Sequence, residues 1–371
     1  MYAPSVDIEA EALDLAEGAA KLAFGTRFKR VPRAILRKLS VPVVFVLGVI
    51  VVLYSTAMGV VNRWMENSVP GVLNCGILTV NAALGLVMYL CCVYRDPGRV
   101  PVGWKPDAEA GGALLELKRK GGSRFCKKCV RHKPPRTHHC RVCNRCVLRM
   151  DHHCVWVNNC VGHRNYKSFF LFLLYITAAC VHALGIFVAH AVHNVSGTGT
   201  PGTEPSGTGM HPGNGLHPGQ GTNPGTGTNP GDGGDMGSAV LEVACLTLSF
   251  PLSIALSLLF GWHCYLVVNN KTTIEHYEGV RSRVVGDGGD GASSSSMAPL
   301  HPTEGAVEHP YSLGLAANLR EILGSEVVCW FAPGCSIAGD GLSFANVAEY
   351  AKWKRARDRK EEELTLMGER K

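Results

Sequence analysis

Residues 126–170 read CKKCVRHKPPRTHHCRVCNRCVLRMDHHCVWVNNCVGHRNYKSFF and hold seven of the 15 cysteines in this 371-residue chain. Two residues separate Cys126 from Cys129, and the same spacing recurs among Cys140, Cys143 and Cys146. Two thiolates at this spacing can reach one tetrahedral ion, and a neutral imidazole can supply a further ligand. The stretch therefore predicts a zinc-binding segment.

The segment offers more ligands than two zinc ions require. Two structural sites need eight ligands. Seven cysteines and five histidines provide twelve candidates, the histidines being His132, His138, His139, His152 and His153. Several must have another role, and spacing alone leaves open which thiol is spare. Because a site with four protein ligands has no position for a reactive water, we expect this zinc to be structural.

Apolar runs flank the cysteine-rich segment on both sides. They cover residues 41–61, 72–94, 168–192 and 239–268. About 20 residues, at 1.5 Å each, cross the ~30 Å hydrocarbon core of a bilayer. Buried helices of a soluble protein are the alternative, but such long apolar runs are rare there. We therefore expect an α-helical integral membrane protein with four transmembrane helices, in which a cytosolic zinc-binding domain (residues 95–167, core 124–170) lies between helices 2 and 3.

Basic residues predict the orientation of these spans. Of the 37 Lys and Arg, seven precede the first span, seventeen lie between Arg95 and Lys167, and twelve follow the fourth span. Arg63 alone lies between spans one and two, and none lies between spans three and four. The positive-inside rule then places both termini and the central loop in the cytosol. Because the cytosol is reducing, metal binding or thiol chemistry is favoured over disulfides. The net charge of +7 is then explained mostly by basic residues that flank the spans and set their orientation, so we expect no nucleic acid partner.

The remaining segments predict little chemistry. Residues 1–40 form a cytosolic segment without a cleavable signal peptide, and its basic cluster either lies against anionic headgroups or is a solvated stop signal. Residues 194–237 are rich in Gly, Thr and Pro and predict a disordered lumenal loop. The cytosolic region 269–371 contains a Gly/Ser-rich linker at 285–305, a short amphipathic helix at 311–324, and a charged tail at 351–371.

The run from Cys126 to Phe169 closely resembles the cysteine-rich domain of the DHHC family of protein S-acyltransferases, or palmitoyltransferases. The spacing agrees at every Cys and His, and the tetrapeptide Asp151–Cys154 lies between the second and third of four spans, as in the family. Three shorter matches lie outside this run: Asp96-Pro97-Gly98, Thr272-Thr273-Ile274-Glu275, and Tyr311-Ser312-Leu313-Gly314 with Asn318. The resemblance covers roughly residues 40–350 without the lumenal loop. The chain departs from it at Val155, where many members have proline.

The resemblance implies which residues bind zinc. It pairs Cys126, Cys129, His139 and Cys146 on one ion, and Cys140, Cys143, His153 and Cys160 on the other. Cys154 then remains beside His152, with Asp151 preceding both. An imidazole that takes the thiol proton raises the reactive thiolate fraction, and a carboxylate behind it fixes its tautomer.

The expected reaction therefore has two steps and uses acyl-CoA, such as palmitoyl-CoA, as co-substrate. Cys154 attacks the thioester of acyl-CoA, and a cysteine of a protein substrate at the cytosolic membrane face then accepts the acyl group. By analogy with the family, Lys133, Arg136 and His138 contact CoA phosphates, although solvated surface charges are the alternative. Small residues of the third span (Ala178, Ala179, Ala183) either leave a deep acyl cavity or pack helices together.

Rival functions fit this sequence less well. A non-catalytic, membrane-anchored zinc scaffold keeps the eight ligands but has no need of Asp151, His152 and Cys154. A zinc-knuckle or RING-like module does not match the spacing. A transporter would need an ionisable side chain within the spans to carry an ion or a proton. The apolar runs contain no acidic residue when the fourth is counted from Val243. The sequence is compatible with Golgi, endosomal or plasma membranes.

Overall fold

The structure of this chain, a computed structural model, describes residues 38–106, 114–116, 124–197, 232–280, 282–284, 309–333 and 339–345. The predictions for the N-terminal basic cluster, the 285–305 linker and the charged tail lie outside the described residues, as does the lumenal loop at 198–231. Ser40–Lys371 forms one unit, and its described residues are discussed below.

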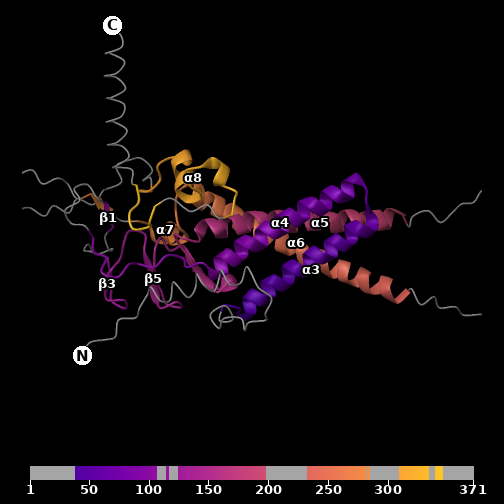
Figure 1. The fold of residues 1–371 in the computed structure, drawn as a ribbon, viewed down its shortest axis with the longest axis horizontal. Helices are drawn as coiled ribbons and strands as arrows, with labels where there is room; N and C mark the ends of the chain where they lie inside the picture. The colour runs from indigo at the N-terminus through magenta and orange to yellow at the C-terminus, as the bar shows by residue number, and fades with distance from the viewer. Residues whose placement is uncertain are drawn as a thin grey trace, which may run out of the picture. The chain divides into compact units, whose positions relative to one another are not determined.

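Four long apolar helices make up the membrane-spanning part (Figure 1): α3 Val41–Trp64, α4 Val69–Tyr94, α5 Tyr166–Gly197 and α6 Asp232–Val268. Each is long and apolar enough to cross a bilayer. Helix α5 packs against the other three, and 50% of its span is buried, against 17% to 33% in the others. The predicted four spans, with the cysteine-rich domain between the second and third, are confirmed.

Some helix ends differ from the predicted boundaries. Helix α4 begins at Val69 rather than residue 72, because the Ser68 side chain accepts a hydrogen bond from the Gly71 N–H (3.2 Å) and Pro70 occupies the first turn. Helices α5 and α6 both extend into the predicted lumenal loop, at residues 194–197 and 232–237. Pro251 lies inside α6 without ending it.

The cysteine-rich domain consists of three short antiparallel hairpins. They pair β2 Phe125–Cys126 with β3 Arg131–His132, β4 His138–Cys140 with β5 Arg145–Val147, and β6 His152–Cys154 with β7 Asn159–Val161. The 3-10 turn η1 (Val155–Val157) connects β6 to β7. Asn144 and Asn158 have φ of 50° and 48°, and asparagine tolerates this left-handed conformation. A further pair joins β1 Leu114–Glu116 to β8 Ser282–Val284.

The region after the fourth span adds two helices, α7 Thr273–Glu278 and α8 Leu315–Leu323, and the 3-10 turn η2 Val327–Cys329. Helix α7 starts at a capping box, in which Thr272 and Glu275 satisfy each other's backbone N–H groups. Helix α8 is shorter than predicted, because Gly314 (φ 91°) is not helical and the N–H of Leu313 bonds instead to the Asn318 side chain (2.9 Å).

A buried apolar cluster joins the helices to the cysteine-rich domain. It contains Tyr89 of α4, Val157 of η1 and Phe169 of α5. The Tyr89 hydroxyl donates to the carbonyl of Trp156 (2.7 Å). The Asn159 amide donates to the carbonyls of Cys92 (3.0 Å) and Arg95 (2.9 Å) and so satisfies groups at the end of α4. These contacts fix the domain to the ends of α4 and α5.

Candidate functional site

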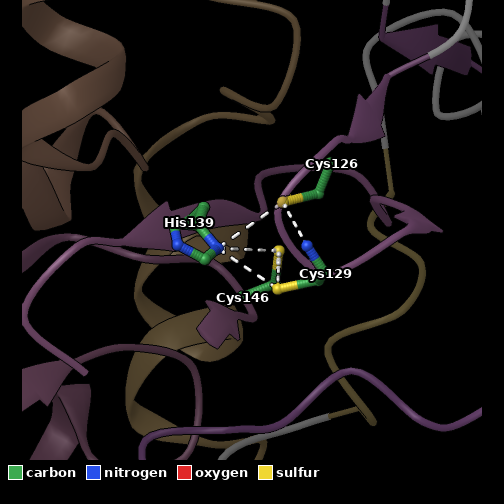
Figure 2. Close-up of side chains that lie close together, drawn as sticks. All are labelled: Cys126, Cys129, His139 and Cys146. Atoms are coloured by element: carbon green, nitrogen blue, oxygen red, sulfur yellow. Dashed lines mark hydrogen bonds between the residues drawn. The ribbon is translucent and has the colours of Figure 1, made fainter. Parts of the chain in front are cut away.

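One group of metal-ligand side chains joins the first two hairpins. Figure 2 shows Cys126, Cys129, His139 and Cys146 pointing toward a common centre. The Nδ1 atom of His139 lies 3.5 Å, 3.2 Å and 3.9 Å from the sulfurs of Cys126, Cys129 and Cys146. His139 and Cys146 face each other across the β4–β5 pair, which brings their side chains together.

A second group repeats this arrangement with Cys140, Cys143, His153 and Cys160. The Nδ1 atom of His153 lies 3.7 Å, 3.5 Å and 3.6 Å from the three sulfurs in chain order. His153 and Cys160 again face each other across a hairpin, here β6–β7. Every ligand of this group lies 14 residues after its counterpart in the first group. The two sites are therefore interleaved copies of one pattern.

The donor geometry fits a tetrahedral ion. Bonds of ~2.3 Å to sulfur and ~2.0–2.1 Å to nitrogen give tetrahedral edges of about 3.5–3.8 Å between ligand atoms. The nitrogen–sulfur distances above scatter around this range, and the Cys129–Cys146 and Cys143–Cys160 sulfurs are 3.7 Å and 3.5 Å apart. Three sulfurs and one imidazole within 4.8 Å of one another can hold a metal ion in each group.

Cys154 belongs to neither group and lies beside a hydrogen-bonded pair. The Nδ1 atom of His152 lies 2.6 Å from Oδ2 of Asp151. With its Nδ1–H directed to the carboxylate, the imidazole keeps Nε2 for another partner. Cys154 lies two positions after His152 on the β6 strand, so both side chains project from the same face of that strand. The β6 strand thus presents His153 to the metal group, while His152 and Cys154 project from its other face.

The surroundings of Asp151 and His152 favour the charged form of both side chains. Burial lowers the pKa of His152, but the hydrogen bond with Asp151 and the influence of the nearby Cys154 outweigh burial and raise that pKa to about 9. Burial raises the pKa of the Asp151 carboxyl, yet the contact with His152 lowers it overall. Asp151 is fully buried. An ionised carboxylate therefore lies behind an imidazole that readily holds a proton.

Helix α7 also binds the Asp151 carboxylate. The Thr273 N–H donates to Oδ1 (2.8 Å), and the Thr273 hydroxyl donates to Oδ2 (2.9 Å). Two residues later, Glu275 forms a bidentate ion pair with Arg136 at 2.7 Å and 2.8 Å. Thr273 and Glu275 therefore bind α7 to the cysteine-rich domain. Arg136 pulls the Glu275 pKa well below its usual value despite the burial of that carboxyl.

The structure places Arg136 differently from the expected phosphate contact. Its side chain is 1% exposed, and Glu275 and Asn270 occupy its guanidinium. Arg136 therefore joins α7 to the cysteine-rich domain and does not offer a surface charge. Lys133 and His138 are half-buried, and Nε2 of His138 lies 3.3 Å from a guanidinium nitrogen of Arg124.

Two asparagines of this region were not singled out for these roles from the sequence. Asn270 is the first residue of a glycosylation-type sequence, Asn-Lys-Thr, but it is fully buried and binds Arg136, Arg149 and the Tyr311 carbonyl. Its local backbone is left-handed, with φ of 47°, and asparagine adopts this conformation easily. This local preference does not predict its distant partners. The role of Asn159 could not be predicted from its neighbours in the sequence, since the carbonyls it binds lie at the end of α4. Asn318 braces the end of α6 through the Val268 carbonyl (2.7 Å).

An apolar cavity lies inside the helix bundle. Side chains from all four helices line it, among them Leu53, Leu78, Ala179 and Leu252. Ala183 also lines the cavity, whereas Ala178 is exposed on another face of α5. Cys154 is 8% exposed and packs in the apolar cluster that joins this bundle to the cysteine-rich domain. The Cys154 thiol is therefore buried among apolar side chains.

The chain is similar to known acyltransferases over most of its length. A family model described as DHHC palmitoyltransferase matches residues 119–280. Probable protein S-acyltransferase 16 of Arabidopsis thaliana is 39% identical over 312 residues, which cover 82% of this chain and 92% of the relative. Probable protein S-acyltransferase 15 of the same plant is 34% identical over 79% of this chain and 97% of its own length. Palmitoyltransferase ZDHHC2 of Homo sapiens is 33% identical over 60% of this chain and 46% of its own length.

Proposed function

This chain belongs to the DHHC palmitoyltransferase family and is a protein S-acyltransferase, and we propose that it moves a long-chain acyl group from acyl-CoA, through a thioester on Cys154, to cysteines of other proteins. The observation that carries this proposal is the hydrogen-bonded Asp151–His152 pair, which shares the β6 strand with Cys154, a thiol that neither metal-ligand group uses. A thiol paired with an oriented imidazole is the arrangement expected of a nucleophilic cysteine.

The first step forms the acyl-enzyme. His152 takes the Cys154 proton, and the thiolate attacks the carbonyl carbon of the acyl-CoA thioester. The bond from that carbon to the CoA sulfur breaks, and CoA leaves as a thiol with the proton that His152 returns. Asp151 keeps the imidazole oriented and stabilises its positive charge.

The second step repeats this exchange with a protein substrate. His152 takes the proton of the substrate cysteine, whose sulfur attacks the acyl carbon. The bond to Cys154 breaks, and Cys154 recovers a proton. Each step exchanges one thioester for another, so the reaction balances without an oxidant or a reductant.

Two zinc ions suit the two ligand groups by donor set and geometry. When bound, they would hold the hairpins in shape, since four protein ligands fill a tetrahedral site. Cys126, Cys129, His139 and Cys146 would hold one ion, and Cys140, Cys143, His153 and Cys160 the other. His153 would then fix the backbone between the two reactive residues His152 and Cys154.

The helix bundle suits an acyl chain. Keeping a long chain out of water is favourable by ~0.8 kcal/mol per buried methylene. We assign the acyl chain to the apolar cavity of the helix bundle, with the CoA part on the cytosolic side near Lys133 and His138. The charge distribution supports cytosolic termini and a cytosolic cysteine-rich domain, and hence substrates at the cytosolic face.

The decisive experiment is labelling of the purified protein with radioactive palmitoyl-CoA. Wild-type protein should acquire a hydroxylamine-sensitive label, and Cys154→Ser should acquire none while keeping its zinc. Cys75→Ser is the matched control, because Cys75 of α4 packs against a different apolar cluster from the one that contains Cys154, and it should label like the wild type. Absent or equal label on wild type and Cys154→Ser, with zinc intact, would favour the non-catalytic zinc scaffold.

A further inference from the structure

Residues 339–345 form a C-terminal segment that folds back onto the cysteine-rich domain. The Gly339 carbonyl lies 3.2 Å from Nε2 of His163, from which it accepts a hydrogen bond. Gly341 packs so closely on the same imidazole that a Cβ there would lie 2.7 Å from the ring. Leu342 packs against the small core formed by Val100, Leu148 and two metal-ligand cysteines of the first group. The segment is therefore docked at several independent points.

Phe344 brings an aromatic ring to Arg136. The guanidinium carbon lies 5.0 Å from the centre of the Phe344 ring and 4.6 Å from that of Tyr311. The two rings are themselves in edge contact, 6.0 Å apart at 69°. They cover a cation that is 1% exposed. Since a cation–π contact is stronger away from water, this enclosure favours the observed position of the guanidinium.

Arg136 connects this enclosure to the reactive residues. It pairs with Glu275 of α7, and the neighbouring Thr273 donates two hydrogen bonds to Asp151. Asp151 in turn orients His152. An unbroken series of side-chain and backbone contacts therefore runs from Phe344 to the imidazole beside Cys154.

We propose that the segment 339–345 positions the reactive residues: Phe344 holds Arg136 against Glu275, which fixes α7 and through it the Asp151–His152 pair. This inference rests on the proposed acyl transfer. Phe344 is a positioning residue, because it acts through Arg136. The alternative is a C-terminal segment that only stabilises the fold.

Phe344→Ala tests the proposal in the full-length, zinc-loaded protein. We expect the single-turnover rate constant for Cys154 acylation to fall roughly two- to thirty-fold, the range that corresponds to losing one cation–π contact. The concentration of palmitoyl-CoA for half-maximal rate should stay the same, since the segment does not contact the proposed CoA site. Phe344→Tyr keeps an aromatic face and should restore the rate.

A double variant separates positioning from general stabilisation. Thr273→Val removes one hydrogen bond between α7 and Asp151. If Phe344 acts through α7, adding Phe344→Ala to Thr273→Val should slow acylation by less than two-fold further, because the two changes share one route. Phe331→Ala is the matched control: this phenylalanine is 57% exposed and should leave the rate unchanged.

Hydrogen exchange gives a readout that does not need activity. Amides of Thr273–Glu278 should exchange roughly ten-fold faster in Phe344→Ala, while amides of α4 keep their protection. Gly341→Ala should produce the same pattern, because its Cβ would displace the segment from His163.

The outcomes separate this inference from the proposed function. If wild-type protein acquires no label on Cys154, the acyl-transfer proposal fails first. If the wild type is acylated and Phe344→Ala matches it in rate and in α7 exchange, the positioning role is refuted. Independent, multiplicative effects of Phe344→Ala and Thr273→Val would also refute it, as would a slower rate explained by loss of zinc.

Discussion

Replacing Thr273 with valine keeps the shape of the side chain and removes the hydroxyl that donates to Oδ2 of Asp151 at 2.9 Å. The Thr273 N–H still donates to Oδ1, and His152 still contacts Oδ2. One hydrogen bond to a charged, fully buried acceptor is therefore lost without a change in volume. Such bonds contribute about 1.5–3 kcal/mol.

If this whole contribution acts in the transition state, the rate constant falls by roughly ten- to 150-fold, at 1.36 kcal/mol per factor of ten. The reason is that Asp151 orients the imidazole and stabilises its charge, and a less constrained carboxylate does both less well. We therefore expect slower acylation of Cys154 at saturating palmitoyl-CoA.

The assay is rapid mixing of purified protein with radioactive palmitoyl-CoA, followed by acid quench and counting of hydroxylamine-sensitive label. Thr247→Val serves as control, because the Thr247 hydroxyl bonds only within its own helix, to the Val243 carbonyl, among the contacts described. Acylation of Thr273→Val at the wild-type rate, with zinc content and melting temperature unchanged, would refute the reasoning that α7 holds Asp151 for the reaction.

Three further changes test other parts of the structure. Cys146→Ser should reduce bound zinc from about two ions per chain to about one, measured by plasma mass spectrometry; two ions retained would contradict the ligand assignment. Ala179→Phe should fill the bundle cavity and lower palmitoyl-CoA labelling relative to a twelve-carbon acyl-CoA by roughly ten-fold, whereas Ala178→Phe, on an exposed position of the same helix, should not. Glu275→Gln should lower stability by about 3–5 kcal/mol, because the buried Arg136 charge loses its bidentate partner and keeps only the more distant Glu321 carboxylate, at 3.8 Å. Since the Glu275 pKa is lowered on folding, its contribution is complete above the ordinary value near 4.5 and declines as pH falls below it, so thermal melts of wild type and variant in detergent should converge in acid.

The sequence by itself was sufficient for the architecture and the ligand chemistry. The apolar runs identify the spans, because a bilayer requires about 20 residues per helix. The repeated Cys-x2-Cys spacing predicts metal binding, because two thiolates at that distance reach one ion. The 14-residue offset between the two ligand groups is also present in the sequence, but His138 and His152, and Cys140 and Cys154, have the same separation. The offset therefore does not choose the ligands, and the pairing came from the resemblance. These features are local, so spacing along the chain determines them.

The role of Arg136 was decided only by tertiary structure. From the sequence it was one basic residue among several in a basic loop, and a phosphate contact was a natural expectation. Its guanidinium instead pairs with Glu275, 139 residues away, and lies against Phe344, still further along the chain. Asn159 and Asn270 acquire their partners in the same way, from segments that meet only after the chain has folded. Burial reverses the expected role, because a charge withdrawn from water requires a fixed counter-charge, and only the folded chain determines which residue supplies it.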